Sequence, residues 1–202
     1  NIWQRRCQAV GAKIVTAQLP YPLNDADTVR ALTDAASERT RIIIISHVTS
    51  PTAAILPVQQ ICEMAKQRGI LTAIDGPHAI AMLDVHLDKI GCDYYCASCH
   101  KWLCAPFGSG FLWVHPRHHH NVKCPIVSWG GSMAGHAPIW QDRTNWLGTR
   151  DPAPLISISA AIAFFKRIGL NTFREHAHQL ICHARRELLA IDGVGPFCTA
   201  SE

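Results

Sequence analysis

A lysine, an aspartate and a few hydrogen-bond donors stand at spacings suited to chemistry on an imine. Lys101 closely follows Ser98 and His100, and a glycine-rich run, Phe-Gly-Ser-Gly, begins six residues later. Asp75 ends the apolar run of residues 69–75. A lysine amine can capture an aldehyde as a Schiff base, and a carboxylate can keep a pyridine nitrogen protonated. Hydroxyl and imidazole groups can bind phosphate, so the set is what pyridoxal 5'-phosphate (PLP) requires.

The segments around these residues resemble the class V aminotransferase family. The resemblance is carried by Asp-Gly-Pro-His at residues 75–78 and by residues 96–114, and residues 46–52 and 146–152 fit the same pattern. Within the family, the sequence is most similar to the isopenicillin N epimerase-like branch, which is related to the cysteine desulfurases. The Asp-x-x-His and Ser-x-His-Lys pieces are specific in combination, and the resemblance covers essentially the whole chain.

The resemblance implies a role for each matching residue near the lysine. Lys101 resembles the Schiff-base lysine, and Asp75 matches the acid on the pyridine nitrogen. His78 stands where the family often has a Gln or His near the ring hydroxyl, and Ser98 and His100 match phosphate ligands. We therefore expect a PLP cofactor, with Lys101 and His78 as the catalytic residues.

Two threonines extend the implied site. Thr49 stands where desulfurases carry an Asn that touches the ring hydroxyl, which makes it a candidate cofactor contact. Thr149 matches a threonine that reaches the phosphate in the neighbouring subunit. The resemblance thus implies a homodimer that shares its active sites, with an amino acid or amino-acid derivative as substrate.

The reaction itself stays open among several that begin by weakening a bond at the substrate Cα. Transamination, epimerisation, β-elimination and desulfuration all use the released lysine as an acid and base. A desulfurase also needs a nucleophilic cysteine on a mobile loop, which in the family lies beyond residue 202. We favour an epimerase-like or aminotransferase-like enzyme, with a cysteine desulfurase or lyase as the alternative.

Composition limits the classes of protein. A chain of 202 residues with 48% hydrophobic and 17% charged residues is typical of a globular protein with one good core. The net charge of +4, without a dense basic stripe, argues against a nucleic-acid partner. The longest apolar run, residues 154–165, is too short to span a bilayer, and no N-terminal signal is evident. We expect a cytoplasmic enzyme.

Clustered cysteines and histidines raise a second class of function. Cys92, Cys96, Cys99 and Cys104 lie close together, but only one pair has the spacing of a zinc knuckle. A zinc-binding or non-catalytic interaction module is the alternative, whereas we favour reduced, buried thiols and no metal site. Three consecutive histidines in residues 115–120 are expected in a solvated loop, because adjacent side chains diverge.

Periodicity predicts an alternation of strands and helices. Strands are expected at residues 13–19, 41–47, 70–75, 93–97 and 110–114, the second one covered on both faces. Helices are expected at residues 3–10, 24–37 and 57–69, and after Pro154 and Phe173, with a flexible loop at 127–137. The order favours a three-layer, mostly parallel α/β sheet with helices on both faces, resembling the large domain of fold type I PLP transferases.

The parallel order also predicts where the reactive groups meet. Residues 47–52, 75–78 and 98–101 each follow a strand end, and ligands of such sheets bind beyond the carboxyl ends of the strands. Trp102 is expected to pack away from the lysine, because neighbours in sequence point apart.

The domain organisation is expected to be that of part of a longer enzyme. Residues 1–168 are assigned to the central and C-terminal part of the PLP-binding large domain. Residues 169–202 are assigned to a long helix that leads towards a small domain. No segment matches the family's upstream phosphate-binding loop, its ring-stacking aromatic residue or its arginine for the substrate carboxylate.

Overall fold

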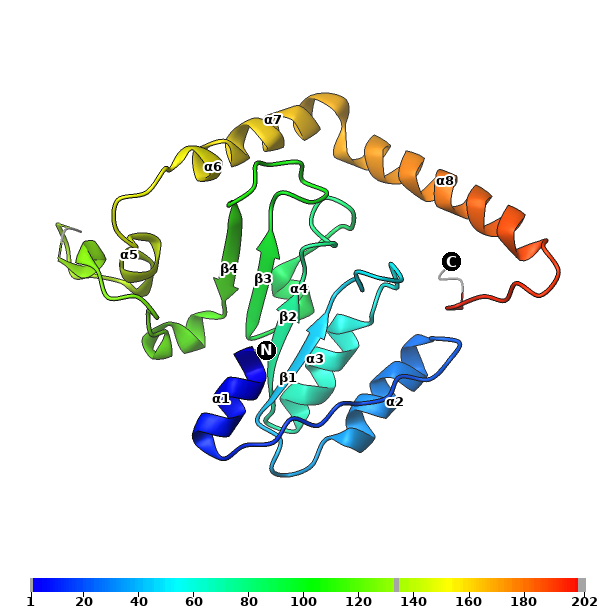
Figure 1. The fold of residues 1–202 in the computed structure, drawn as a ribbon, viewed down its shortest axis with the longest axis horizontal. Coiled ribbons are helices and arrows are strands. Elements are labelled where there is room, and N and C mark those ends of the chain that lie inside the picture. The colour runs from blue at the N-terminus through cyan, green and yellow to red at the C-terminus, as the bar shows by residue number, and fades with distance from the viewer. Residues whose placement is uncertain (1, 133–134, 200–202) are drawn as a thin grey trace.

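A four-stranded sheet forms the centre of the protein in a computed structural model, which describes residues 2–132 and 135–199 (Figure 1). Residues 1, 133–134 and 200–202 lie outside the described residues, and so do the corresponding parts of the expected segments 1–168, 127–137 and 169–202. The strands lie in the order β1-β2-β3-β4, the first three parallel and β4 antiparallel to β3. Their bounds are β1 Ile42–Ser46, β2 Leu71–Asp75, β3 Tyr94–Ser98 and β4 Gly110–Val114. The predicted mostly parallel α/β fold is confirmed.

Helices precede, connect and follow the strands. They are α1 Ile2–Val10, α2 Asp25–Ala35, α3 Val58–Gln67, α4 Leu87–Ile90, α5 Trp140–Asn145, α6 Ala153–Ile156, α7 Ile158–Ile168 and α8 Leu170–Leu189, with 3₁₀ turns η1 Pro116–Asn121 and η2 Trp129–Gly131. The longer helices match the predicted ones. The short α4, α5 and η2 were not predicted, because one turn of helix carries too little hydrophobic periodicity to detect.

Local chemistry explains where α2 and α3 begin and end. The Asn24 side chain accepts a hydrogen bond from the Asp27 backbone nitrogen at 2.8 Å, which caps α2. Helix α3 starts after Pro57, whose fixed φ and missing N–H suit a helix start. It ends before Gly69, whose φ of 68° favours glycine. The bounds of both helices are therefore determined by residues that are not part of the apolar pattern.

The core lies between the sheet and one layer of helices. Ile61 and Ala65 of α3 are fully buried and pack with Ile43 of β1 and Ile70. A second cluster joins Val58 and Cys62 of α3 to Ile74, Tyr95 and Ala97 of the strands and to Ile90 and Cys92. These apolar contacts fix the sheet against α3 and α4.

The opposite face of the sheet is open in the described part of the chain. Ile44 of β1 is 41% exposed, Leu112 of β4 is 48% exposed, and Cys96 is exposed between them. The expectation that residues 41–47 are covered on both faces is therefore wrong for this chain. An unbroken run of isoleucines indicates high strand propensity. It does not show whether each face of the sheet is covered by a helix or open.

The strand predicted at residues 13–19 is absent from the described structure. These residues form an extended connection from α1 to α2, and Ile14 and Val15 are 49% and 71% exposed. A strand needs a neighbouring backbone to satisfy its N–H and C=O groups. Residue propensity alone could not supply that neighbour.

The polar segment after β4 is folded against the sheet, which corrects the expectation of a solvated loop. Residues 116–121 form η1, and His118 is brought within 2.6 Å of the buried Asp93 carboxylate. Asp93 also accepts from the Thr72 backbone nitrogen at 2.8 Å and pairs with Arg117. Although burial raises its pKa, the hydrogen bonds from Arg117, His118 and Thr72 lower the pKa of Asp93 overall.

Helix α8 is held to the loop after β2 by one arginine. Arg174 donates to the carbonyl oxygens of Ala81 at 3.1 Å and Leu83 at 2.6 Å, and it pairs with Asp84. No residue of α8 is itself buried, and Figure 1 shows the helix extending away from the sheet. A second attachment follows the helix, where the Leu23 nitrogen donates to the Phe197 carbonyl at 3.0 Å and Arg185 of α8 donates to the Cys198 carbonyl at 2.8 Å.

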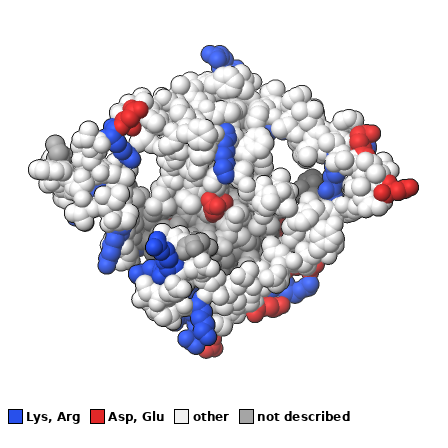
Figure 2. All heavy atoms as spheres, in the orientation of Figure 1, with Lys and Arg blue, Asp and Glu red and all other residues white. Residues whose placement is uncertain are grey.

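The visible face of the molecule carries no dense patch of charge. On the face shown in Figure 2, Lys and Arg side chains are scattered with large uncharged areas between them. Among the described helices, no single one has the length and hydropathy needed to cross a bilayer. Only α6–α7 together with α8 pass that test, as a pair bent by 75°.

Replacing Asp93 tests the network below the sheet. Asp93→Asn should lower the free energy of unfolding by about 2–3 kcal/mol, because Arg117 and the Thr72 N–H lose a charged acceptor. The pKa of Asp93 is lower when folded, so this contribution is complete above about pH 4 and is lost as pH falls further. Urea unfolding at pH 7 and pH 3 measures both effects, with the exposed Asp192→Asn as the control. Equal losses of unfolding free energy for Asp93→Asn and Asp192→Asn at pH 7 would contradict the stabilising role of the Asp93 network.

Candidate active site

The ends of three parallel strands are joined by backbone hydrogen bonds. The His47 nitrogen donates to the Asp75 carbonyl at 2.9 Å, and the Gly76 nitrogen donates to the Cys96 carbonyl at 2.8 Å. Ser46, Asp75 and Cys96 are in register across β1, β2 and β3. The segments that follow these strands therefore start from one edge, as the parallel order predicts.

His78 lies at the centre of the site. Its Nε2 is 2.8 Å from the Lys101 Nζ, and its Nδ1 is 3.4 Å from the Trp102 Nε1. Burial lowers the pKa of His78, the Lys101 charge lowers it further, and Asp75 opposes both effects. Lys101 and Asp75 thus both act on one imidazole, although they come from different strand ends.

Trp102 corrects a prediction. We expected it to pack away from Lys101, yet the two neighbours contact the same histidine through its two ring nitrogens. The chain turns sharply after β3, where residues 99–103 form a turn rather than an extended segment. Adjacent side chains diverge in a strand or helix, but a turn can aim them at one group.

Asp75 is open to solvent at the end of β2. Its neighbour across the sheet is Cys96, whose thiol donates to the Asp75 Oδ1 at 3.8 Å. Burial and the Asp75 charge raise the pKa of Cys96. The thiol therefore stays protonated at neutral pH, and the carboxylate remains available to an incoming cationic ring nitrogen.

A buried nitrogen without a partner belongs to the residue just before the lysine. The Nδ1 of His100 is buried, and within the described residues it has no hydrogen-bond partner. Its ring lies 4.7 Å from that of Phe107, and Ser98, which ends β3, precedes it by two residues. A buried, unsatisfied nitrogen costs about 1–3 kcal/mol, so this position fits an oxygen-rich group such as a phosphate.

Gly76 and Tyr95 support the turn that carries Asp75 and His78. A Cβ atom at Gly76 would lie 2.0 Å from the Tyr95 Oη, which is an impossible contact. Tyr95 is fully buried, and its hydroxyl lies 3.0 Å from the His47 Nδ1. Burial lowers the pKa of His47 to about 4, so that the ring is neutral. Sequence reasoning missed this support, and Asp-Gly after a strand was its only signal.

The two threonines are placed differently from the other site residues. The Thr49 hydroxyl lies 2.6 Å from that of Thr52 and accepts from the Ala54 nitrogen, so it is used within its own turn. Thr149 is exposed on the connection between α5 and α6, which Figure 1 shows beyond β4. In the described residues, His78 contacts Lys101 and lies within the influence of the Asp75 charge, whereas the contacts of Thr49 lie within its own turn.

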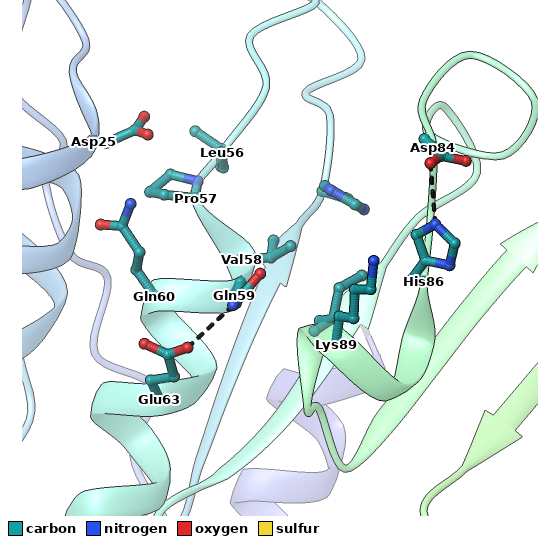
Figure 3. Close-up of a pocket in the computed structure, with 12 residues that line it drawn as sticks. Asp25, Leu56, Pro57, Val58, Gln59, Gln60, Glu63, Asp84, His86 and Lys89 are labelled. Atoms are coloured by element: carbon teal, nitrogen blue, oxygen red, sulfur yellow. Dashed lines mark hydrogen bonds and ion pairs between the residues drawn. The ribbon is translucent and has the colours of Figure 1, made fainter. Parts of the chain in front are cut away.

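A separate polar cleft of about 440 Å³ lies between α3 and α4. Figure 3 shows Gln59 joined to Glu63 on one wall and Asp84 joined to His86 on the other. None of the predicted site residues lines it. Nowhere in residues 2–132 and 135–199 do three or more His, Cys, Asp or Glu side chains form a group that could hold a metal ion.

Comparison with known proteins decides the family. The profile of the family described as aminotransferase class V matches residues 1–201. This chain belongs to the class V aminotransferase family. Membership confirms the family resemblance and PLP as the cofactor for which the fold is built, and the orphan nitrogen of His100 agrees with an anionic group there.

The relatives of this class V chain include both isopenicillin N epimerases and probable cysteine desulfurases. The isopenicillin N epimerase of Amycolatopsis lactamdurans is 37% identical, over 98% of this chain and 53% of its own length. A probable cysteine desulfurase of Xylella fastidiosa is 32% identical, over 98% of this chain and 48% of its own length. The chain thus spans about half the length of these relatives.

Solved structures confirm the class V fold. A cysteine desulfurase from Thermococcus onnurineus superposes with a TM-score of 0.74 at 22% identity, over 92% of this chain and 47% of that one. A C-DES mutant with glycine covalently linked to its PLP cofactor gives a TM-score of 0.79 at 19% identity, over 97% and 55%. The architecture is that of the fold type I enzymes.

Adding one methyl group at Gly76 tests the support of the site. Gly76→Ala should lower the free energy of unfolding by about 3 kcal/mol, because the buried Tyr95 ring must move to accept the new Cβ. Urea denaturation measures this loss. Gly195→Ala is the matched control, since nothing lies within 4 Å of the added atom there. Equal unfolding midpoints for the two variants would show that Tyr95 does not constrain the turn.

Proposed function

We propose that this chain forms the cofactor-binding part of a PLP-dependent enzyme that acts at the Cα of an amino acid or amino-acid derivative. The observation that carries the proposal is the 2.8 Å contact between the Lys101 Nζ and the His78 Nε2. It joins the Asp-x-x-His segment after β2 to the Ser-x-His-Lys segment after β3, which sequence places far apart.

Each residue of the site has a task in this proposal. PLP supplies an electron sink that stabilises negative charge at the substrate Cα. The Asp75 carboxylate would keep the pyridine nitrogen protonated, and Ser98 and His100 would donate hydrogen bonds to the phosphate. Lys101 would hold the cofactor and would serve as the acid and base at the substrate Cα, while His78 would orient the amine and approach the ring hydroxyl.

The outcome we favour is epimerase-like or aminotransferase-like. The epimerase relatives share 37% identity with this chain, against 32% for the desulfurase quoted above. A cysteine desulfurase or lyase is the second candidate, supported by the similarity of this chain to probable cysteine desulfurases.

Domain and partner assignments complete the proposal. Residues 1–168 form part of the large domain, and residues 169–202 lead to a small domain that covers α8, whose Leu180 and Ile181 are more than half exposed. A homodimer brings the exposed Thr149 to the phosphate of the neighbouring site. We place the enzyme in the cytoplasm, where its nine free cysteines stay reduced.

Removal of the lysine amine tests the proposal. With added PLP, the wild-type chain should gain a visible absorption band and, after borohydride treatment, a stable adduct on the peptide that contains Lys101. Lys101→Ala should show neither, because no other amine occupies that position. Absorption spectra and peptide mass spectrometry provide the measurement.

The matched control for this experiment is Lys123→Ala, at an exposed lysine on the segment that follows η1. It should retain both the band and the adduct. Identical spectra for wild type and Lys101→Ala would end the proposal for this chain.

A further inference from the structure

An apolar pocket of about 540 Å³ lies between the helices α7 and α8 and the segments that follow the strands. Ile162 and Leu170 contribute to it from α7 and α8, while Ile80, Leu103 and Phe111 come from the loop after β2, the turn after β3 and the start of β4. Its volume falls in the range of about 300–1,000 Å³ that is typical of small-molecule sites. None of the residues proposed to hold PLP lines it, so the pocket is distinct from that site.

The walls of this apolar pocket belong to the packed part of the protein. Ala81, Cys99 and Phe165 line it and are all buried. Arg174 also lines it and donates to the carbonyl oxygens of Ala81 and Leu83, which holds α8 against the loop after β2. The pocket is therefore formed before any ligand arrives, and binding does not require these walls to become ordered.

The charge at the pocket is positive and is not fully compensated. Among the described residues that line the pocket, only Lys166 and Arg174 are not apolar, and none is acidic. Arg174 pairs with Asp84, which lies outside the lining. The Lys166 side chain is exposed, and no hydrogen bond or ion pair joins it to another side chain or carbonyl in the part of the chain that the structure describes. The rim thus carries one ammonium group beside an apolar cavity.

We propose that this pocket binds a small amphipathic anion, an apolar chain or ring that carries one carboxylate or a similar group. The apolar body displaces water that finds few hydrogen bonds at the walls, which favours binding. The anionic group pairs with Lys166 at the rim, where both charges stay in contact with water and escape the cost of burial. A cationic head group would be repelled there. The inference is independent of the proposed function, because neither Lys101 nor PLP takes part in it.

Methyl NMR of the full chain can locate the ligand, with octanoate as the probe. The isoleucine δ1 methyl groups are labelled, and their signals are assigned by single isoleucine-to-valine variants. Octanoate should shift the signals of Ile80 and Ile158, which line the pocket, and the shifts should saturate. The signals of Ile14 and Ile44, which are exposed elsewhere, should not move. Octanol, with the same chain and no charge, is titrated in parallel.

Two pairs of variants on α7 test the apolar body and the charge separately. Ile162→Glu places a carboxylate in the pocket and should abolish octanoate binding, whereas Ile168→Glu should not, because Ile168 is equally exposed at 42% but does not line the pocket. Lys166→Gln should weaken octanoate binding by about two- to fivefold, the effect of one exposed ion pair, and should leave octanol binding unchanged. Arg167→Gln, outside the lining, should change neither.

Four results would overturn the inference. Shifts that do not saturate, or that extend to Ile14 and Ile44, would mean that octanoate has no defined site. Equal affinities in Ile162→Glu and Ile168→Glu would place the site elsewhere. A Lys166→Gln protein with an unchanged octanoate affinity would show that the pocket accepts any apolar group, such as a segment of another protein. Shifts of the same pocket methyl signals on raising the protein concentration alone would identify a second copy of this chain as the occupant.

Discussion

Parallel hydrogen bonding between β1, β2 and β3 is the constraint on which the site depends. It places Ser46, Asp75 and Cys96 in one row, so that the three following segments leave the sheet from the same edge. From there the chain needs only three residues to reach His78 and five to reach Lys101. A shift of β2 by one residue would turn Asp75 to the face that carries α3, and no change in the loops could restore the arrangement.

The two ends of β3 carry groups with different roles. Asp93, just before the strand, gathers Arg117, His118 and the Thr72 backbone into a buried network that holds η1 against the sheet. Ser98, at the other end, opens the segment that carries Lys101. Charges that stabilise the fold thus lie at the opposite end of β3 from the charges proposed to do chemistry.

Sequence was informative where a local rule decides the structure, and silent where a distant partner does. Asn24, Pro57 and the isoleucines of β1 each carry a local signal, and the elements they predict are present. The positions of Asp75 and Lys101 after strands in a parallel order predicted that they leave the sheet at one edge, whereas their proposed roles came from the family resemblance. The extended residues 13–19 were misjudged because pairing depends on a neighbour that propensity does not reveal. Trp102 was misjudged because the turn that redirects it has no periodic pattern, and the contact between His118 and Asp93 joins residues that sequence shows only as separate charges.

The overlap between Gly76 and Tyr95 has a consequence for how such proteins diverge. Any side chain at position 76 would enter the space of the phenol, and the phenol in turn is fully enclosed and bonded to His47. Position 76 therefore cannot change before position 95 does: a lineage that lost the glycine would first have to shrink the aromatic residue, and would pass through a poorly packed ancestor. The steric limit thus fixes the order in which the two positions can change.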